Sequence, residues 1–136
     1  MNNDTLKSIG AIFAGAIVGA LPALGTDQLM HATGVFPPPD QAMSGSLFLL
    51  ATAYRAIYGV AGSYVAARLA PSRPMLHSLI LGAIGVAVCV VGTAVTWNKG
   101  PEFGPHWYPL ALVALGMPQA WVGGKLAKVP SPARAG

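Results

Sequence analysis

Residues 8–32 read SIGAIFAGAIVGALPALGTDQLMHA and decide the fold class, because this long apolar run contains a single charged residue. A run of this length can cross about 30 Å of hydrocarbon as an α-helix. Small residues recur at every fourth position, and the row then continues into two polar residues: Ala11, Gly15, Gly19, Ala23, Asp27 and His31. Positions four apart lie on one helix face, so the sequence predicts a smooth packing stripe that ends in a polar group.

The composition extends this interpretation to the whole chain of 136 residues. Hydrophobic residues make up 54% and charged residues 9%, against roughly 25% charged in soluble domains. Three further apolar segments are separated by Pro- and Gly-rich breaks, which are typical of loops. We predict an all-α, four-transmembrane-helix bundle in a single integral membrane domain, 1–136, with spans at 6–32, 42–70, 75–97 and 106–127. The N-terminus resembles a signal peptide, but the apolar run continues beyond it, which favours an uncleaved first helix.

The charges indicate an orientation rather than a nucleic-acid partner. The net charge is +4, but the basic residues lie at segment ends without a patch, so we expect no nucleic acid. One side of the predicted membrane holds Lys7, Arg68, Arg73, Lys125, Lys128 and Arg134, and the other holds Lys99. Cytoplasmic loops carry the excess of Lys and Arg, so both termini are expected in the cytoplasm. Aromatic belts agree, with Trp97, Trp107 and Tyr108 outside and Tyr64 and Trp121 inside.

The ends of the second and fourth spans resemble each other. SYVAARLA at 63–70 and AWVGGKLA at 120–127 share an aromatic residue, Val, two small residues, a basic residue, Leu and Ala in register. Two tandem helical hairpins would give this pattern as a parallel repeat. Shared composition at cytoplasmic helix ends would give it equally well.

Each predicted helix also has one face of small residues. In lipid, helices associate where small residues let their backbones approach closely. The glycines that we expect at these helix contacts are Gly15, Gly19, Gly59, Gly82, Gly85 and Gly116. The same faces would serve a compact bundle or a homo-oligomer, and the sequence does not separate the two.

Arg55 lies near the middle of the second span, and the nearest acid inside a span is Asp27. An arginine there costs roughly 2.5–3.5 kcal/mol on insertion scales, so it requires a partner. Antiparallel packing of the first two spans would bring the guanidinium and the carboxylate together. We therefore predict a buried ion pair, with Tyr54 and Tyr58 (and Gln28) completing the hydrogen bonding and His31 at its outer side. The pair would either fix the helix register or form part of a site for an anion, proton or substrate.

Other chemistry has little support in the sequence. Asp27 and His31 have the i, i+4 spacing of a metal pair, with His106 as a third candidate. This is a weak signal, and we expect no metal and no cofactor. No serine, cysteine or acid pair has a catalytic arrangement, so we expect no enzyme. Cys89, the sole cysteine, is expected to be a small packing residue.

Three segments carry a resemblance: GTDQLMHATGVFPP at 25–38, ATAYRAIYGVAGSYVAARLAPSRPMLH at 51–77 and TWNKGPEFGPHWYP at 96–109. They resemble an uncharacterised family of small four-helix bacterial integral membrane proteins. The resemblance covers nearly the whole chain and implies the bacterial inner membrane and four helices, with no activity attached. The membrane-embedded glutamate of small multidrug exporters and the pattern of fluoride channels are absent.

The function expected from these features is a structural or accessory role without catalysis. The chain would act in the lipid bilayer as a homo-oligomer or as a subunit of a larger membrane complex. The alternative is a small transporter or channel, in which Asp27, Arg55 and His31 form a polar site that opens outward. A cavity that reaches Arg55 would favour transport, whereas a closed bundle with a paired Arg55 would favour the structural role.

Overall fold

The computed structural model describes residues 3–38, 44–99 and 105–128. Four α-helices make up the fold: α1 (Asn3–Ala32), α2 (Gly45–Leu69), α3 (Pro74–Thr96) and α4 (Trp107–Lys128). The all-α prediction is confirmed, and each helix coincides with a predicted span to within a few residues. Arg134, which the charge prediction included, lies outside the described residues.

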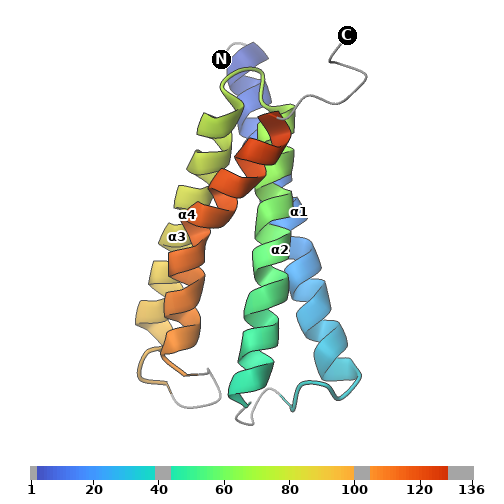
Figure 1. Ribbon diagram of the computed structural model, residues 1–136, viewed down its shortest axis with the longest axis vertical. Coiled ribbons are helices and arrows are strands. Elements are labelled where there is room, and N and C mark those ends of the chain that lie inside the picture. The colour runs from blue at the N-terminus through green and yellow to red at the C-terminus, as the bar shows by residue number, and fades with distance from the viewer. Residues whose placement is uncertain (1–2, 39–43, 100–104, 129–136) are drawn as a thin grey trace.

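The four helices form two antiparallel hairpins, α1–α2 and α3–α4, which follow one another along the chain (Figure 1). Helices α2 and α4 pack extensively against each other and join the hairpins. The hairpins come together at the end where α1 begins and α4 ends, and they diverge toward the opposite end (Figure 1). The expectation of a compact bundle is therefore correct for one end only.

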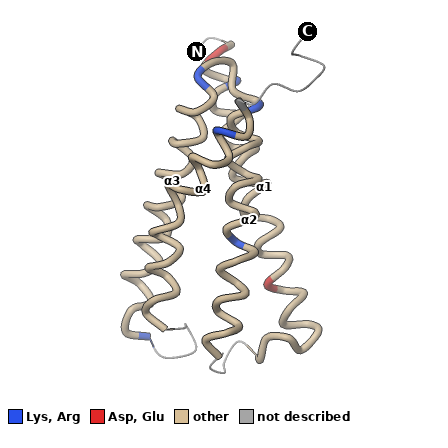
Figure 2. The backbone as a smooth tube through the Cα atoms, viewed as in Figure 1, with Lys and Arg blue, Asp and Glu red and all other residues tan. Residues whose placement is uncertain are grey.

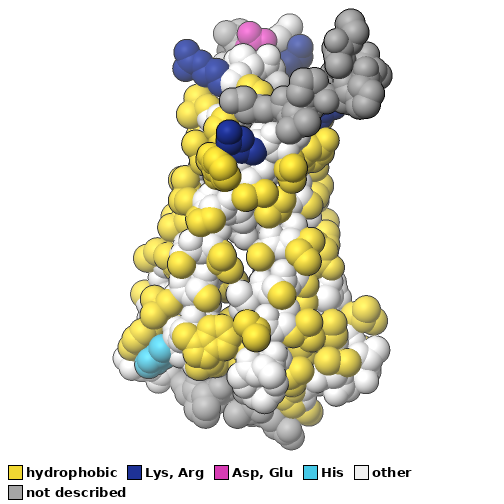
Figure 3. Space-filling view, viewed as in Figure 1, with side chains coloured by type: hydrophobic (Ala, Val, Ile, Leu, Met, Phe, Trp, Pro, Cys, Tyr) yellow, Lys and Arg dark blue, Asp and Glu magenta, His cyan; other side chains and the backbone are white. Residues whose placement is uncertain are grey.

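Three of the helices, α1, α3 and α4, are long and apolar enough to cross a membrane. Helix α2 is not among them, although its 25 residues would extend about 38 Å at 1.5 Å per residue. The reason lies in its position, because α2 contacts all three other helices and has more buried residues than any of them. Its inward faces carry small and hydroxyl side chains, and it also carries Arg55. On the face of the bundle that Figure 3 shows, apolar side chains cover much of the surface between the two ends.

Glycine contacts explain the tight hairpins. A Cβ atom on Gly15 would lie 2.5 Å from the carbonyl oxygen of Gly62, and a Cβ on Gly62 would lie 2.5 Å from that of Gly15. These two backbones therefore touch, as expected where small residues face each other in lipid. In the second hairpin a Cβ on Gly82 would lie 2.5 Å from the Cβ of Ala120. Gly15 and Gly82 thus both lie where two helices approach closely.

Two other glycines depart from the sequence-based expectation. A Cβ on Gly85 would meet no atom within 4 Å, so its predicted role at a helix contact is wrong. Gly123, which the sequence analysis did not single out, sits where α4 meets α2: a Cβ there would lie 2.6 Å from the carbonyl oxygen of Val60. Glycine content indicates where helices can approach, but the partner helix decides which glycine is used.

The two similar segments make the same local contact. Arg68 lies 6.0 Å from the ring centre of Tyr64, and the Lys125 ammonium lies 5.1 Å from that of Trp121. In both pairs the cation follows the aromatic residue by four positions, on the last turns of α2 and α4. The structure thus has two tandem hairpins whose aligned positions form equivalent cation–π contacts.

Candidate functional site: an ion pair beside a cavity

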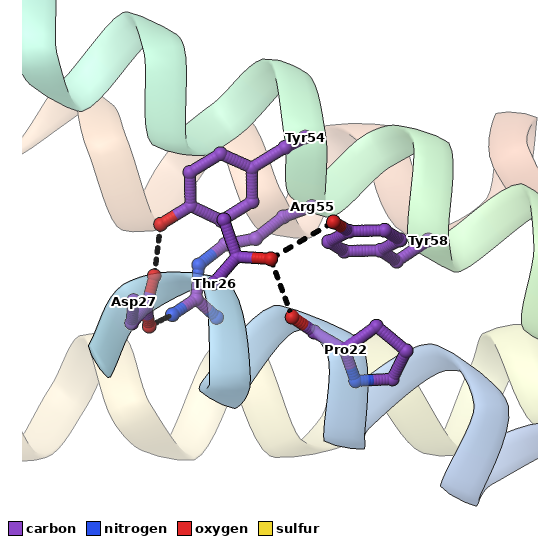
Figure 4. A network of polar contacts seen from close by, with 6 residues as sticks. All are labelled: Pro22, Thr26, Asp27, Tyr54, Arg55 and Tyr58. Carbon is purple, nitrogen blue, oxygen red and sulfur yellow. Dashed lines mark hydrogen bonds and ion pairs between the residues drawn. The ribbon is translucent and has the colours of Figure 1, made fainter. Parts of the chain in front are cut away.

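The predicted ion pair is present between the first two helices. The Nη2 atom of Arg55, on α2, donates a hydrogen bond to one carboxylate oxygen of Asp27, on α1. The hydroxyl of Tyr54 donates to the other carboxylate oxygen. Figure 4 shows both side chains reaching from α2 toward the same carboxylate. Two consecutive residues of one helix therefore hold both oxygens of the acid.

A second set of hydrogen bonds lies one turn away. The hydroxyl of Thr26 donates to the carbonyl oxygen of Pro22 at 2.7 Å. It also lies 2.8 Å from the hydroxyl of Tyr58. Because Thr26 has one O–H and gives it to Pro22, Tyr58 is the donor in the second bond. Tyr58 was predicted to bond to the ion pair, but its hydroxyl donates instead to Thr26, the residue before Asp27 (Figure 4).

Thr26 was missed by sequence reasoning, although a signal was present. It follows Pro22 by four residues and immediately precedes Asp27. A threonine hydroxyl inside a helix often bonds back to the carbonyl oxygen four residues earlier, as Thr26 does to Pro22. Here the same hydroxyl also receives a bond from α2, so it links the two helices.

The ion pair is only partly shielded. The exposed fractions of the Arg55 and Asp27 side chains are 29% and 21%. The Nε atom of Arg55 is nevertheless buried, and it has no hydrogen-bond partner among the described residues. An unpaired buried donor costs about 1–3 kcal/mol. The pair therefore neutralises the charge of the guanidinium without satisfying all of its donors.

His31 does not belong to this group, contrary to the prediction. Its Nδ1 atom lies 2.8 Å from the carbonyl oxygen of Pro37, and its ring packs edge-on against Phe36 at 5.4 Å. His31 therefore holds the turn after α1. Gln28 is exposed. Contrary to the prediction, it does not complete the hydrogen bonding of the ion pair.

The weak metal hypothesis gains nothing from these positions. Nε2 of His106 lies 2.8 Å from the carbonyl oxygen of Trp97, and the two rings stack with centres 3.6 Å apart. The third histidine, His77, lies at the opposite end of the bundle and is 2.8 Å from the hydroxyl of Ser8. Within residues 3–38, 44–99 and 105–128, no group of three His, Cys, Asp or Glu side chains is placed to hold a metal.

A cavity of about 380 Å³ lies between the two hairpins, beside the ion pair. All four helices contribute to its wall, and Arg55 is part of it. The six glycines predicted to mediate helix contacts all line this cavity: Gly15, Gly19, Gly59, Gly82, Gly85 and Gly116. The small residues thus have two effects, because they allow close contact where helices meet and leave open space where helices diverge.

Few polar side chains interrupt the apolar wall. Besides Arg55, the polar side chains lining it are Ser63, Cys89 and Gln119. Gln119 lies against Gly59, where a Cβ atom would come within 2.5 Å of the amide. Sequence reasoning missed Gln119, although it is the one carboxamide inside the fourth apolar span. The site is thus an apolar chamber with one cationic residue, Arg55, and the amide of Gln119 at its wall.

Comparison of the chain with protein-family models, with curated protein sequences and with solved structures finds no match in any of the three.

Proposed function

We propose that this chain is a small multi-pass protein of the bacterial inner membrane with a structural or accessory role and no catalysis. It would act as a homo-oligomer or as a subunit of a larger membrane complex. One observation carries the proposal: the carboxylate of Asp27 has both oxygens bonded by α2, from Tyr54 and Arg55. An acid engaged in this way is a clasp between two helices, since buried polar groups can fix register.

The proposed orientation places both termini in the cytoplasm. Lys and Arg gather at the end of the molecule where the N-terminus lies (Figure 2), and Lys99 follows α3 at the opposite end. This distribution supports the orientation because Lys and Arg accumulate on the cytoplasmic side. Fusions at the C-terminus test it: green fluorescent protein should fluoresce, and alkaline phosphatase should be inactive. The reverse result would contradict the orientation.

The accessory role is tested by asking what accompanies the protein when it leaves the membrane. Extraction in mild detergent and native mass spectrometry should give a defined oligomer or a complex with another membrane protein. Asp4→Asn, an exposed change near the start of α1, serves as the matched control for Asp27→Asn. We expect Asp27→Asn to weaken the assembly because it releases the hairpin. A monomer without any partner under all mild conditions would contradict the accessory role.

A small transporter or channel is the second candidate, and the cavity that reaches Arg55 favours it. A transport path must admit water, whereas an accessory protein needs none. Cys89 lines the cavity and is the sole cysteine of the sequence, so it reports water access directly. A charged, membrane-impermeant thiosulfonate should leave Cys89 unmodified in the accessory case. Rapid modification from the outer side would favour transport.

A further inference from the structure

The exposed residues of the cavity wall all come from α1 and α3, so the mouth of the cavity lies between these two helices. Its lining includes Leu24 from α1, and Ile84 and Val88 from α3, whose exposed fractions are 56%, 48% and 65%. Helices α1 and α3 share few contacts with each other. A hydrogen bond between the side chains of Ser8 and His77 joins them near the ends at which both helices begin. Exposed apolar side chains in the middle of membrane helices face lipid. The mouth therefore opens sideways into the bilayer.

The volume of the cavity and the residues of its wall define which kind of molecule can bind in it. A volume of about 380 Å³ is near the lower limit of small-molecule pockets, roughly 300–1,000 Å³. A two-chain phospholipid is too large to enter as a whole. The wall is mostly apolar, and glycines widen it on every helix. An apolar body the size of one short chain or one ring fits this space.

The polar groups define the head of such a molecule. Arg55 and Gln119 both line the cavity and both carry N–H donors. Arg55 has five N–H donors, and Asp27 receives its one hydrogen bond among those described for the guanidinium. The charge of Arg55 is already balanced by Asp27, so an anion would enter an apolar space without a free counter-charge, which is costly. A neutral oxygen acceptor meets the donors without this cost.

We infer that the cavity is a binding site for a small neutral lipid-phase molecule, an apolar body that carries a carbonyl oxygen, which enters between α1 and α3. The carbonyl accepts hydrogen bonds from the Arg55 and Gln119 side chains. The apolar body lies along the glycine-lined wall formed by α3 and α1. The inference goes beyond the accessory or transport role, because either role accommodates such a ligand.

Gly85 provides the sharpest test of the site. It lines the cavity, and a Cβ there would meet no atom within 4 Å, so Gly85→Leu fills the space without disturbing a helix contact. Gly92 is the matched control, because it lies two turns further along α3, has the same free surroundings and is not part of the cavity wall. Circular dichroism verifies that both variants keep their helices.

The probe is a ten-carbon ketone that carries an alkyl diazirine, photolysed with the protein in phosphatidylcholine nanodiscs. Labelled residues are located by peptide mass spectrometry. We expect saturable labelling within 16–24 and 81–89, lowered by about tenfold in Gly85→Leu, which corresponds to about 1.4 kcal/mol. In Gly92→Leu the labelling should stay within about twofold of the unmodified protein, since a distant site contributes little.

Competition identifies the head group. Unlabelled 2-decanone should compete better than decane, and Gln119→Met should reduce that advantage because it deletes the amide donor and leaves only the Arg55 donor. Stronger competition by decanoate than by 2-decanone would overturn the neutral class and identify an anion site. Labelling that does not saturate, that spreads evenly over the lipid-facing helices, or that is equal in Gly85→Leu and Gly92→Leu would overturn the site itself.

Discussion

Breaking the ion pair one charge at a time is the most informative perturbation of this protein. Asp27→Asn keeps the shape and the hydrogen bond from Tyr54 but leaves the guanidinium of Arg55 without its counter-charge. Arg55→Leu leaves the carboxylate unpaired instead. The double variant carries no charge at this depth. If the pair is a clasp, each single change should be more harmful than the double change, because only the singles leave an unbalanced charge.

The structure sets the magnitude. A lone arginine at the centre of a membrane helix costs roughly 2.5–3.5 kcal/mol on insertion scales. The two side chains are 29% and 21% exposed, so solvation lowers that cost. We expect Asp27→Asn to reduce the free energy of unfolding by about 2 kcal/mol. The double variant should lose about 1 kcal/mol or less, because replacing a whole buried pair by uncharged residues is often nearly neutral.

Unfolding in mixed micelles with increasing dodecyl sulfate, followed by the helical circular dichroism signal, measures these differences. Asp4→Asn, an exposed acid on the same helix, is the control and should change the unfolding free energy by less than about 0.5 kcal/mol. The reasoning is refuted if the losses of the two single variants add up to that of the double variant within about 0.5 kcal/mol, since additivity means that the charges do not interact.

Two further predictions concern helix packing and a buried hydroxyl. Gly15→Ala should lower the unfolding free energy by about 1–3 kcal/mol, because the added Cβ would lie 2.5 Å from the Gly62 carbonyl oxygen. Gly10→Ala on the same helix is the control, because its added Cβ meets nothing within 4 Å, and it should be neutral or stabilising. Equal losses in the two variants would contradict the packing. Ser78→Ala should cost about 0.6–1.7 kcal/mol in the same assay, because the fully buried Ser78 hydroxyl donates to the carbonyl of Ala120 across α3 and α4; an unchanged midpoint would contradict that bond.

The sequence alone predicted the fold class and the ion pair because the membrane leaves few alternatives. A spanning segment must satisfy its backbone internally, so long apolar runs have to be helices. Arg55 could be paired with Asp27 because acidic residues are scarce inside the predicted spans and Asp27 is the one within reach. Physical constraints that act on each segment by itself can be read from composition and spacing.

The shape of the site could not be predicted in the same way. Gly15 and Gly85 look alike in sequence, yet one touches a neighbouring backbone and the other faces open space. The difference depends on where α1 and α3 diverge, and that is set by how all four helices pack together. His31 was misplaced for a related reason: its i, i+4 spacing from Asp27 suggested a shared site, but the turn after α1 gave it the Pro37 carbonyl as a closer partner.

The clasp and the cavity are linked through α2. This helix contacts both α1 and α4, and Arg55 contributes to the ion pair and to the cavity wall at once. The pair fixes the position of α1 relative to α2, and α1 forms one side of the cavity mouth. A change that releases Asp27 from Arg55 would therefore widen or close the mouth as well as loosen the hairpin. Whether the pair acts as a clasp or a gate thus reduces to one comparison in Asp27→Asn, which keeps the Arg55 donors: a clasp leaves ketone labelling saturable, whereas a gate abolishes it.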